Sequence, residues 1–199
     1  VNGNLKVLRH KGKSHGVKET RGKYSKGKSI RKRDKSVYSR EEAGHWEADT
    51  VVSGQGKSKA CFATLAERKT RFYIAMKMSD RRAETMENAI VAALSAFPPQ
   101  LVKTITCDRG TEFANWRRIE ERLHCEVYFA DPYCAWQKGT NENLNGLLRE
   151  FYPKGRNLSR VAPATLKRNL ALLNARPRKV LYFHSAQELW DFELNSCCT

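Results

Sequence analysis

Short apolar runs and amphipathic segments alternate along residues 41–199, and their order predicts a mixed α/β sheet. Three runs rich in β-branched and aromatic residues come first, joined by short polar connections, and they predict an antiparallel meander over residues 46–52, 60–66 and 72–78. A helix follows, because apolar residues recur at i, i+3, i+4 and i+7 spacing from Met86 to Phe97. Ser79 or Asp80 can cap this helix, and Pro98 stops it.

The second half of the pattern predicts parallel pairing and then helices. A strand over 102–107, a helix over 113–123 and a strand over 125–130 form a strand–helix–strand unit, which places the two strands parallel in one sheet. Helices over 141–151 and from Pro163 to about Arg176 follow. Three antiparallel strands, a helix and two parallel strands are the order of a ribonuclease H-like fold. We therefore expect an α/β domain with a five-stranded mixed sheet flanked by helices.

Charge divides the chain into two parts. Residues 1–40 hold 14 Lys and Arg against Glu19 and Asp34, a net of +12, out of +16 for the whole chain. Gly and Ser interrupt this segment, and it has too few apolar residues to bury a core. We expect a flexible basic arm over 1–40 and a folded ribonuclease H-like core over 41–199. The arm either binds nucleic-acid phosphates or acts only as a solvated linker that aids solubility.

Several classes of protein do not fit this composition. No apolar run reaches the length of a membrane span, and no signal-peptide core follows the N-terminus, so we expect a soluble, cytoplasmic protein without a membrane partner. The six cysteines show no CxxC spacing and no matching histidine pair. The sequence therefore predicts neither a zinc site nor a disulfide framework.

Three carboxylates occupy positions suited to holding metal ions. Asp49 lies within the first predicted strand, Asp108 ends the strand over 102–107, and Glu142 lies at the start of the helix over 141–151. In the predicted sheet the two aspartates become neighbours, and a helix start can approach the same point. Two Mg²⁺ ions need several hard oxygen ligands from separate elements. A solvated acidic cluster is the alternative interpretation.

Two periodicities refine this candidate site. Alternation along the first strand puts His45, Glu47 and Asp49 on one face, so Glu47 is a neighbour of Asp49 and not itself a ligand. On the helix over 141–151, Glu142, Asn145 and Arg149 lie opposite a leucine stripe. A solvated helix face has the same pattern.

The sequence around the three acids resembles the insertion-sequence-thirty (IS30) family of bacterial transposases, within the integrase-core, or DDE, strand-transfer enzymes. The resemblance covers residues 44–193 and includes the separation of Asp108 from Glu142. It rests on four segments: Gly44-His45-Trp46-Glu47-Ala48-Asp49-Thr50, Asp108-Arg109-Gly110-Thr111-Glu112-Phe113, the block 131–146 with Trp136-Gln137-Lys138-Gly139-Thr140-Asn141-Glu142-Asn143, and Leu173-Asn174-Ala175-Arg176-Pro177-Arg178-Lys179.

The resemblance implies an activity, a cofactor and partners. It implies a DNA transposase core that cuts element ends and transfers strands to target DNA, with Asp49, Asp108 and Glu142 as catalytic residues that bind two Mg²⁺ or Mn²⁺ ions. It also implies a homo-oligomer, because two element ends must be joined. Family members usually carry an N-terminal helix-turn-helix region, so we expect this chain to be a fragment or a truncated copy. A catalytically inactive nucleic-acid-binding remnant and a ribonuclease H-like nuclease are the alternatives.

Candidate DNA contacts lie in the block before and within the Glu142 helix and in the basic arm. Aromatic rings can stack on bases, and glutamine can hydrogen-bond to them. Trp136 can equally anchor its loop on the core, and Arg149 can be an exposed arginine without a phosphate partner. The candidates are Tyr133, Trp136, Gln137, Lys138, Asn145, Arg149, Arg31, Lys32 and Arg33.

Overall fold

A six-stranded mixed sheet forms the centre of the computed structural model, which describes residues 27–132 and 134–197. The strands run in the order β1-β6-β5-β2-β3-β4. The pairs β2–β3 and β3–β4 are antiparallel, whereas β1–β6, β6–β5 and β5–β2 are parallel. This arrangement confirms the α/β ribonuclease H-like fold. The bounds are β1 Lys28–Ser29, β2 His45–Val52, β3 Cys61–Glu67, β4 Tyr73–Met78, β5 Thr104–Cys107 and β6 Glu126–Phe129.

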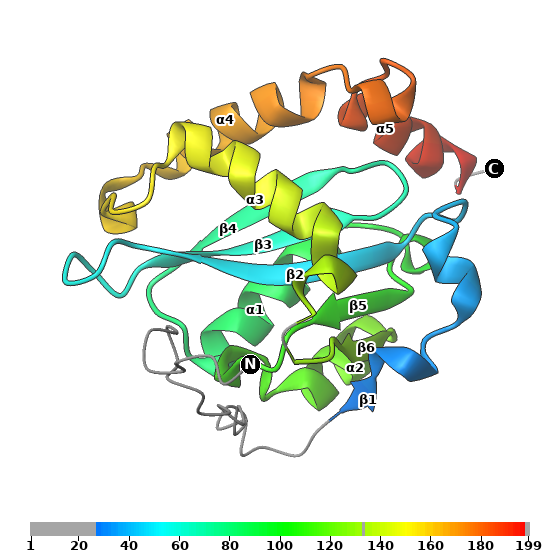
Figure 1. The fold of residues 1–199 in the computed structure, drawn as a ribbon, viewed down its shortest axis with the longest axis horizontal. Coiled ribbons are helices and arrows are strands. Elements are labelled where there is room, and N and C mark those ends of the chain that lie inside the picture. Colours follow the sequence, from blue (N-terminus) through cyan, green and yellow to red (C-terminus); the bar gives the residue numbers. More distant parts are fainter. Residues whose placement is uncertain (1–26, 133, 198–199) are drawn as a thin grey trace, which may run out of the picture.

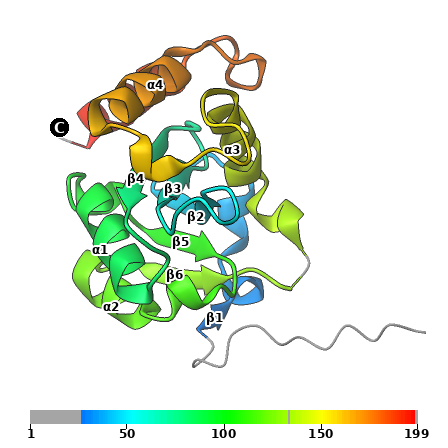
Figure 2. The same ribbon diagram turned by 90° about the vertical axis from the view of Figure 1, so that its left-hand side faces the viewer.

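Helices cover both faces of the sheet. Figures 1 and 2 show α1 and α2 on one face and α3 and α4 on the other. The helix bounds are α1 Ala83–Leu94, α2 Trp116–Leu123, α3 Gly139–Phe151, α4 Pro163–Ala175 and α5 Ala186–Ser196. Short 3-10 turns lie at η2 Ile30–Lys32, η3 Lys35–Tyr38, η4 Pro99–Leu101, η5 Thr111–Phe113, η6 Ala135–Lys138, η7 Leu158–Arg160 and η8 Lys179–Leu181.

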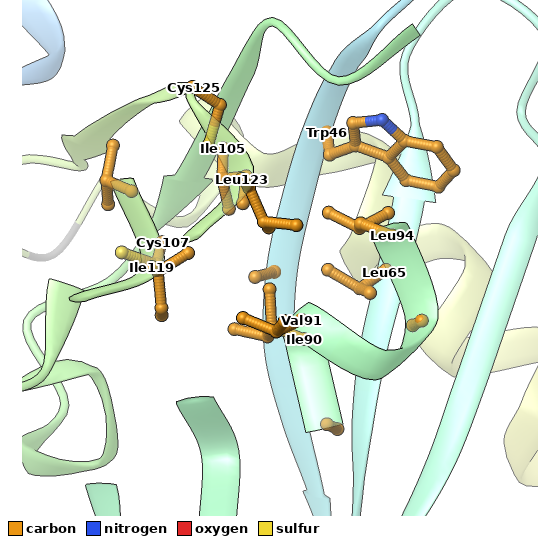
Figure 3. Packing of buried hydrophobic residues seen from close by; sticks show 14 of the residues in the cluster. Trp46, Leu65, Ile90, Val91, Leu94, Ile105, Cys107, Ile119, Leu123 and Cys125 are labelled. Carbon is orange, nitrogen blue, oxygen red and sulfur yellow. The ribbon is translucent and has the colours of Figure 1, made fainter. Parts of the chain in front are cut away.

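Two apolar cores hold these layers together. Every residue of β3 is buried, and alternate side chains enter opposite cores, as the pleat of a strand requires. Leu65 joins Trp46, Ile90 and Leu94 in the core beneath α1 and α2 (Figure 3). On the other face, Phe62 packs among residues of α3 and α4 that include Leu144, Leu148 and Leu166. The α3 leucine stripe therefore fixes which side of that helix faces solvent.

The expected count of five strands was wrong, because part of the basic segment joins the sheet. Lys28 and Ser29 of β1 pair in parallel with Tyr128 and Phe129 of β6. Ile30 is 1% exposed and Val37 is 2% exposed, so this part of the expected flexible arm is packed on the core. Burial of two apolar side chains offsets the ordering of a short basic stretch. Residues 1–26 of the expected arm lie outside the described residues.

A fifth helix, α5, lies beyond the predicted elements. Its start has a capping box, in which the Ser185 hydroxyl accepts from the Glu188 backbone N–H and the Glu188 carboxylate accepts from the Ser185 N–H. Trp190 of this helix is buried against Trp46, Phe72 and Phe97. The helix therefore closes one end of the larger core.

The first long helix starts later than expected. Arg82 is the N-cap of α1, and the upstream Asp80 carboxylate accepts from the Arg82 N–H at 3.0 Å and from the Thr85 hydroxyl at 2.8 Å. Asp80 therefore stabilises the first turn from outside the helix.

Neither a membrane-spanning helix nor a disulfide occurs in the described part of the chain. No described helix is long and apolar enough to cross a bilayer. The cysteines described, at 61, 107, 125, 134 and 197, are all free thiols.

Candidate active site

Two of the three predicted acids come together where β2 and β5 run side by side. The parallel register pairs Glu47 with Thr106, so Asp49 within β2 and Asp108 just after β5, each two residues further on, come to lie side by side. The Lys138 ammonium nitrogen lies 3.3 Å from Asp49 Oδ1 and 3.7 Å from Asp108 Oδ2. A single cationic group therefore contacts both carboxylates.

Lys138, which the sequence predicts as a DNA contact, lies between these two aspartates. Its side chain is only 10% exposed, and its ammonium also donates to the Ala48 carbonyl at 3.2 Å. Burial alone would lower the pKa of Lys138, but the Asp49 and Asp108 carboxylates outweigh burial and raise that pKa above its ordinary value. The side chain is therefore a fixed positive charge between the two aspartates.

Glu142 lies in the first turn of α3, with its side chain exposed. It stands between two residues of its own segment that both contact Asp49. Lys138 is four residues before it, and Asn145, three residues after it, donates to Asp49 Oδ2 at 2.9 Å. The described residues contain no ready-made group of three acidic, His or Cys side chains around a metal position. The structure thus joins Asp49 and Asp108 and leaves Glu142 exposed on the helix beside them.

A buried network that the sequence did not reveal holds α3 against the sheet. Asn141 is fully buried, and its Nδ2 donates to the Glu47 carbonyl at 2.7 Å and to the Thr64 carbonyl at 3.3 Å. The Asn141 backbone N–H donates to Glu47 Oε2 at 2.9 Å. Glu47 is itself fully buried in an ion pair with Arg68. The residue next to Glu142 is therefore anchored to the strand that carries Asp49.

Glu112 lies behind the Asp108 turn. It belongs to η5, is buried, and accepts from the Thr50 hydroxyl at 3.1 Å and from Arg81 at 2.6 Å. The Asp108–Gly110 turn passes so close that a Cβ on Gly110 would lie 2.4 Å from Glu112 Oε2. Glycine at this position lets the Asp108 turn pack on a buried carboxylate.

The candidate DNA contacts before Glu142 divide by exposure. Trp136 is 71% exposed, so it does not anchor its loop on the core. Gln137 is buried; its side chain accepts from the Asp131 backbone N–H and donates to the Asp131 carboxylate, and its base contact stays a prediction. Arg149 donates to the Val52 carbonyl at 3.0 Å and thus braces α3 on β2. Tyr133 lies outside the described residues.

The candidates in the basic segment divide in the same way. Lys32 is exposed, and Arg31 is exposed while paired with Asp131 at 3.0 Å. Arg33 is 3% exposed and donates to the Thr106 hydroxyl of β5 at 2.8 Å. The Arg33 guanidinium is thus buried against the sheet in the DNA-free structure, and its contact with nucleic acid stays a prediction.

His45 has a structural role in this sheet. Its ring nitrogens lie 2.8 Å from the Thr104 hydroxyl and 3.1 Å from Glu42 Oε2. Burial lowers the pKa of His45, although the Glu42 carboxylate opposes that effect. The imidazole joins the start of β2 to β5.

The donor set around Asp49 fits a hard divalent cation. Carboxylate oxygens are the ligands that Mg²⁺ prefers. Here Asp49 Oδ1 and Asp108 Oδ2 already lie on either side of a positive charge, the Lys138 ammonium. Glu142 is accessible on the adjoining helix face to complete the set. These three residues would hold the metal.

Comparison with known proteins identifies the family. The integrase core domain model matches residues 39–135. The chain is 37% identical over 165 residues to a probable transposase for an insertion-like element of Streptococcus salivarius, and 36% identical over 184 residues to the InsI transposase of element IS30C of Escherichia coli. These matches cover 83% and 92% of this chain but 46% and 47% of the relatives, so the chain spans about half of their length.

Solved structures with the same fold are integrase cores. The catalytic core domain of BIV integrase aligns with a TM-score of 0.58 at 16% identity, over 79% of this chain and 99% of that one. The HTLV-2 integrase catalytic core, solved in complex with magnesium, aligns with a TM-score of 0.55 at 13% identity, over 74% of this chain and 95% of that one. At such identities the likeness concerns the fold alone. The sequence matches show that the chain belongs to the IS30 family of transposases and carries the integrase core of the DDE transposase class.

Proposed function

We propose that this chain is the catalytic core that cuts DNA at the ends of a transposable element and joins those ends to target DNA. In this proposal Asp49, Asp108 and Glu142 bind two Mg²⁺ or Mn²⁺ ions. The observation that carries it is the convergence of Asp49 and Asp108 on one cation, with Glu142 between two residues that touch Asp49. Hard ligands from two strands and a helix then surround one point.

The proposed chemistry needs no covalent protein intermediate. Water attacks the phosphodiester at the element end and frees a 3′-hydroxyl, which then attacks a target phosphodiester. Bound metal ions would supply activation of the attacking oxygen and neutralise charge on the leaving oxygen. The chain's own residues position the ligands: Asn145 orients the Asp49 carboxylate, and Asn141 holds the start of α3 against β2.

The proposed partners are DNA and further copies of the chain. Trp136 and Lys32 are exposed, so they are available for base stacking and phosphate contact. Joining two element ends at one target calls for at least two catalytic centres, hence a homo-oligomer. A bacterial transposase would act in the cytoplasm, where its DNA lies.

A branched DNA that mimics an element end already joined to target tests the proposal. The reverse of strand transfer on this substrate needs the catalytic centre and not recognition of a free end, which suits a chain half the length of its relatives. Asp49→Asn, Asp108→Asn and Glu142→Gln should each abolish Mg²⁺-dependent resolution of the branch. The matched control is Glu150→Gln, an exposed glutamate on the same helix, which should retain activity.

The same assay separates the two alternatives. A wild-type chain that binds DNA in a salt-sensitive manner but resolves no branch with Mg²⁺ or Mn²⁺ is an inactive nucleic-acid-binding remnant. A chain that cuts DNA but never forms a new joint is a ribonuclease H-like nuclease. Full activity in any of the three acid variants refutes the assignment of that acid.

A further inference from the structure

Lys138 occupies the position between Asp49 and Asp108 that a shared metal ion would need. Its ammonium makes two ion pairs, at 3.3 Å and 3.7 Å, and a hydrogen bond to the Ala48 carbonyl at 3.2 Å. An ammonium group has three N–H donors, and three oxygen atoms are placed around this one. The site is thus assembled around a cation that the chain itself supplies.

Neither carboxylate has another cationic partner among the described ion pairs. Asp49 Oδ2 accepts from Asn145 and Asp108 Oδ1 accepts from the Gly110 N–H, both neutral donors. Two like charges held close together at a partly buried site repel each other unless a positive charge lies between them. Lys138 therefore holds the pair together before any metal arrives.

A divalent ion and the ammonium cannot occupy this position together. A metal bound to Asp49 Oδ1 and Asp108 Oδ2 would contact the two oxygen atoms that Lys138 now contacts, and the two cations would repel each other. Lysine has a flexible four-carbon stem, so the ammonium can withdraw by rotating its side chain. Lys138 is the N-cap residue of α3 but makes no side-chain cap hydrogen bond, so its ammonium can leave the aspartates without uncapping the helix.

We propose that Lys138 is an internal counter-ion that preassembles the Asp49–Asp108 pair and competes with the first divalent metal for it. This inference rests on the proposed function, since it concerns the same metal centre. It makes a distinct prediction, because removal of the ammonium should strengthen metal binding in the absence of DNA.

Mn²⁺ titration of the DNA-free protein by calorimetry tests the competition. Lys138→Met keeps a long apolar stem and removes the charge, and it should bind Mn²⁺ about tenfold more tightly or better, the ratio that corresponds to 1.4 kcal/mol. Lys77→Met is the matched control, since Lys77 donates to the Ser159 and Val161 carbonyls and to neither aspartate. Its Mn²⁺ affinity should equal that of the wild type.

Two further measurements guard against loss of folding. Lys138→Gln keeps a donor for the Ala48 carbonyl and should show the same gain in affinity. In the wild type, NMR signals of the Lys138 ammonium should lose their protection from exchange when Mg²⁺ is added. Unchanged or weaker Mn²⁺ binding in folded Lys138 variants, or an ammonium signal indifferent to saturating Mg²⁺, overturns the inference and leaves the proposed function standing. If neither the wild type nor any of the variants binds Mn²⁺, both the proposed metal centre and this inference are refuted.

Discussion

Asn141→Ala should loosen the helix that carries Glu142 from the strand that carries Asp49. Asn141 is fully buried and adjacent to Glu142. Alanine is a good helix former, so the change removes the side-chain contacts without disturbing the local helix. The backbone hydrogen bond from residue 141 to Glu47 Oε2 would remain.

The size of the effect follows from the groups left without a partner. The Asn141 side chain donates to the carbonyls of Glu47 and Thr64 and accepts from the Thr64 hydroxyl at 3.1 Å. A net hydrogen bond contributes about 1 kcal/mol, and a buried group left unpaired costs about 1–3 kcal/mol. The Thr64 hydroxyl can still donate to the Asp49 carbonyl, so the loss of its Asn141 acceptor costs less than leaving the hydroxyl unpaired. We expect the free energy of unfolding to fall by roughly 2–4 kcal/mol.

Urea unfolding measured by circular dichroism gives this free energy, with Asn143→Ala as the control. Asn143 is exposed on the same helix, so its replacement should change the free energy of unfolding by no more than about 0.5 kcal/mol. A loss below about 1 kcal/mol for Asn141→Ala, at an unchanged denaturant slope, would show that the buried network does not hold α3 in place.

Three further predictions concern other parts of the structure. Glu47→Gln leaves the Arg68 guanidinium buried without its ion pair and should cost roughly 3–5 kcal/mol in urea unfolding; a loss under about 1 kcal/mol would contradict it. Burial lowers the pKa of His45 in the folded chain, so as the pH falls below 6.5 the unfolded chain binds a proton at this histidine before the folded chain does. The free energy of unfolding should therefore decrease as the pH falls through this range. His45→Gln should flatten that part of the pH profile, and an identical profile would exclude His45 as the cause. Trp136→Ala should leave stability within about 0.5 kcal/mol but weaken DNA binding by about 1–3 kcal/mol in fluorescence anisotropy; unchanged affinity would remove Trp136 from the DNA path.

Local periodicity was sufficient to predict the framework of the site. Alternation along β2 separated Trp46 and Ala48, which enter the larger core, from Glu47 and Asp49, which face α3. The leucine stripe of α3 likewise put Asn145 on the face that meets Asp49. Such patterns are set by neighbours a few positions apart, so a sequence displays them directly.

Contacts between distant residues could not be predicted in the same way. The Asn141 and Glu47 network joins residues 94 positions apart, and no local pattern marks either as a partner of the other. Lys138 follows an exposed tryptophan and resembles a surface lysine until the fold brings it to the aspartates. By contrast, the capping box of Ser185 and Glu188 is a local signal in the sequence that marks the start of α5.

Sulfur substitution at the scissile bond tests the central claim, a metal centre at the three acids, most directly. The branched DNA carries sulfur in place of the leaving oxygen, and its resolution is measured in Mg²⁺ and then in Mn²⁺, which accepts softer ligands. If a metal ion contacts the leaving oxygen, sulfur at that position should block the reaction of the wild type in Mg²⁺. Mn²⁺ should restore the reaction in the wild type but not in Asp49→Asn. Equal cleavage of the sulfur substrate in both ions, or rescue that survives the loss of Asp49, would contradict the account.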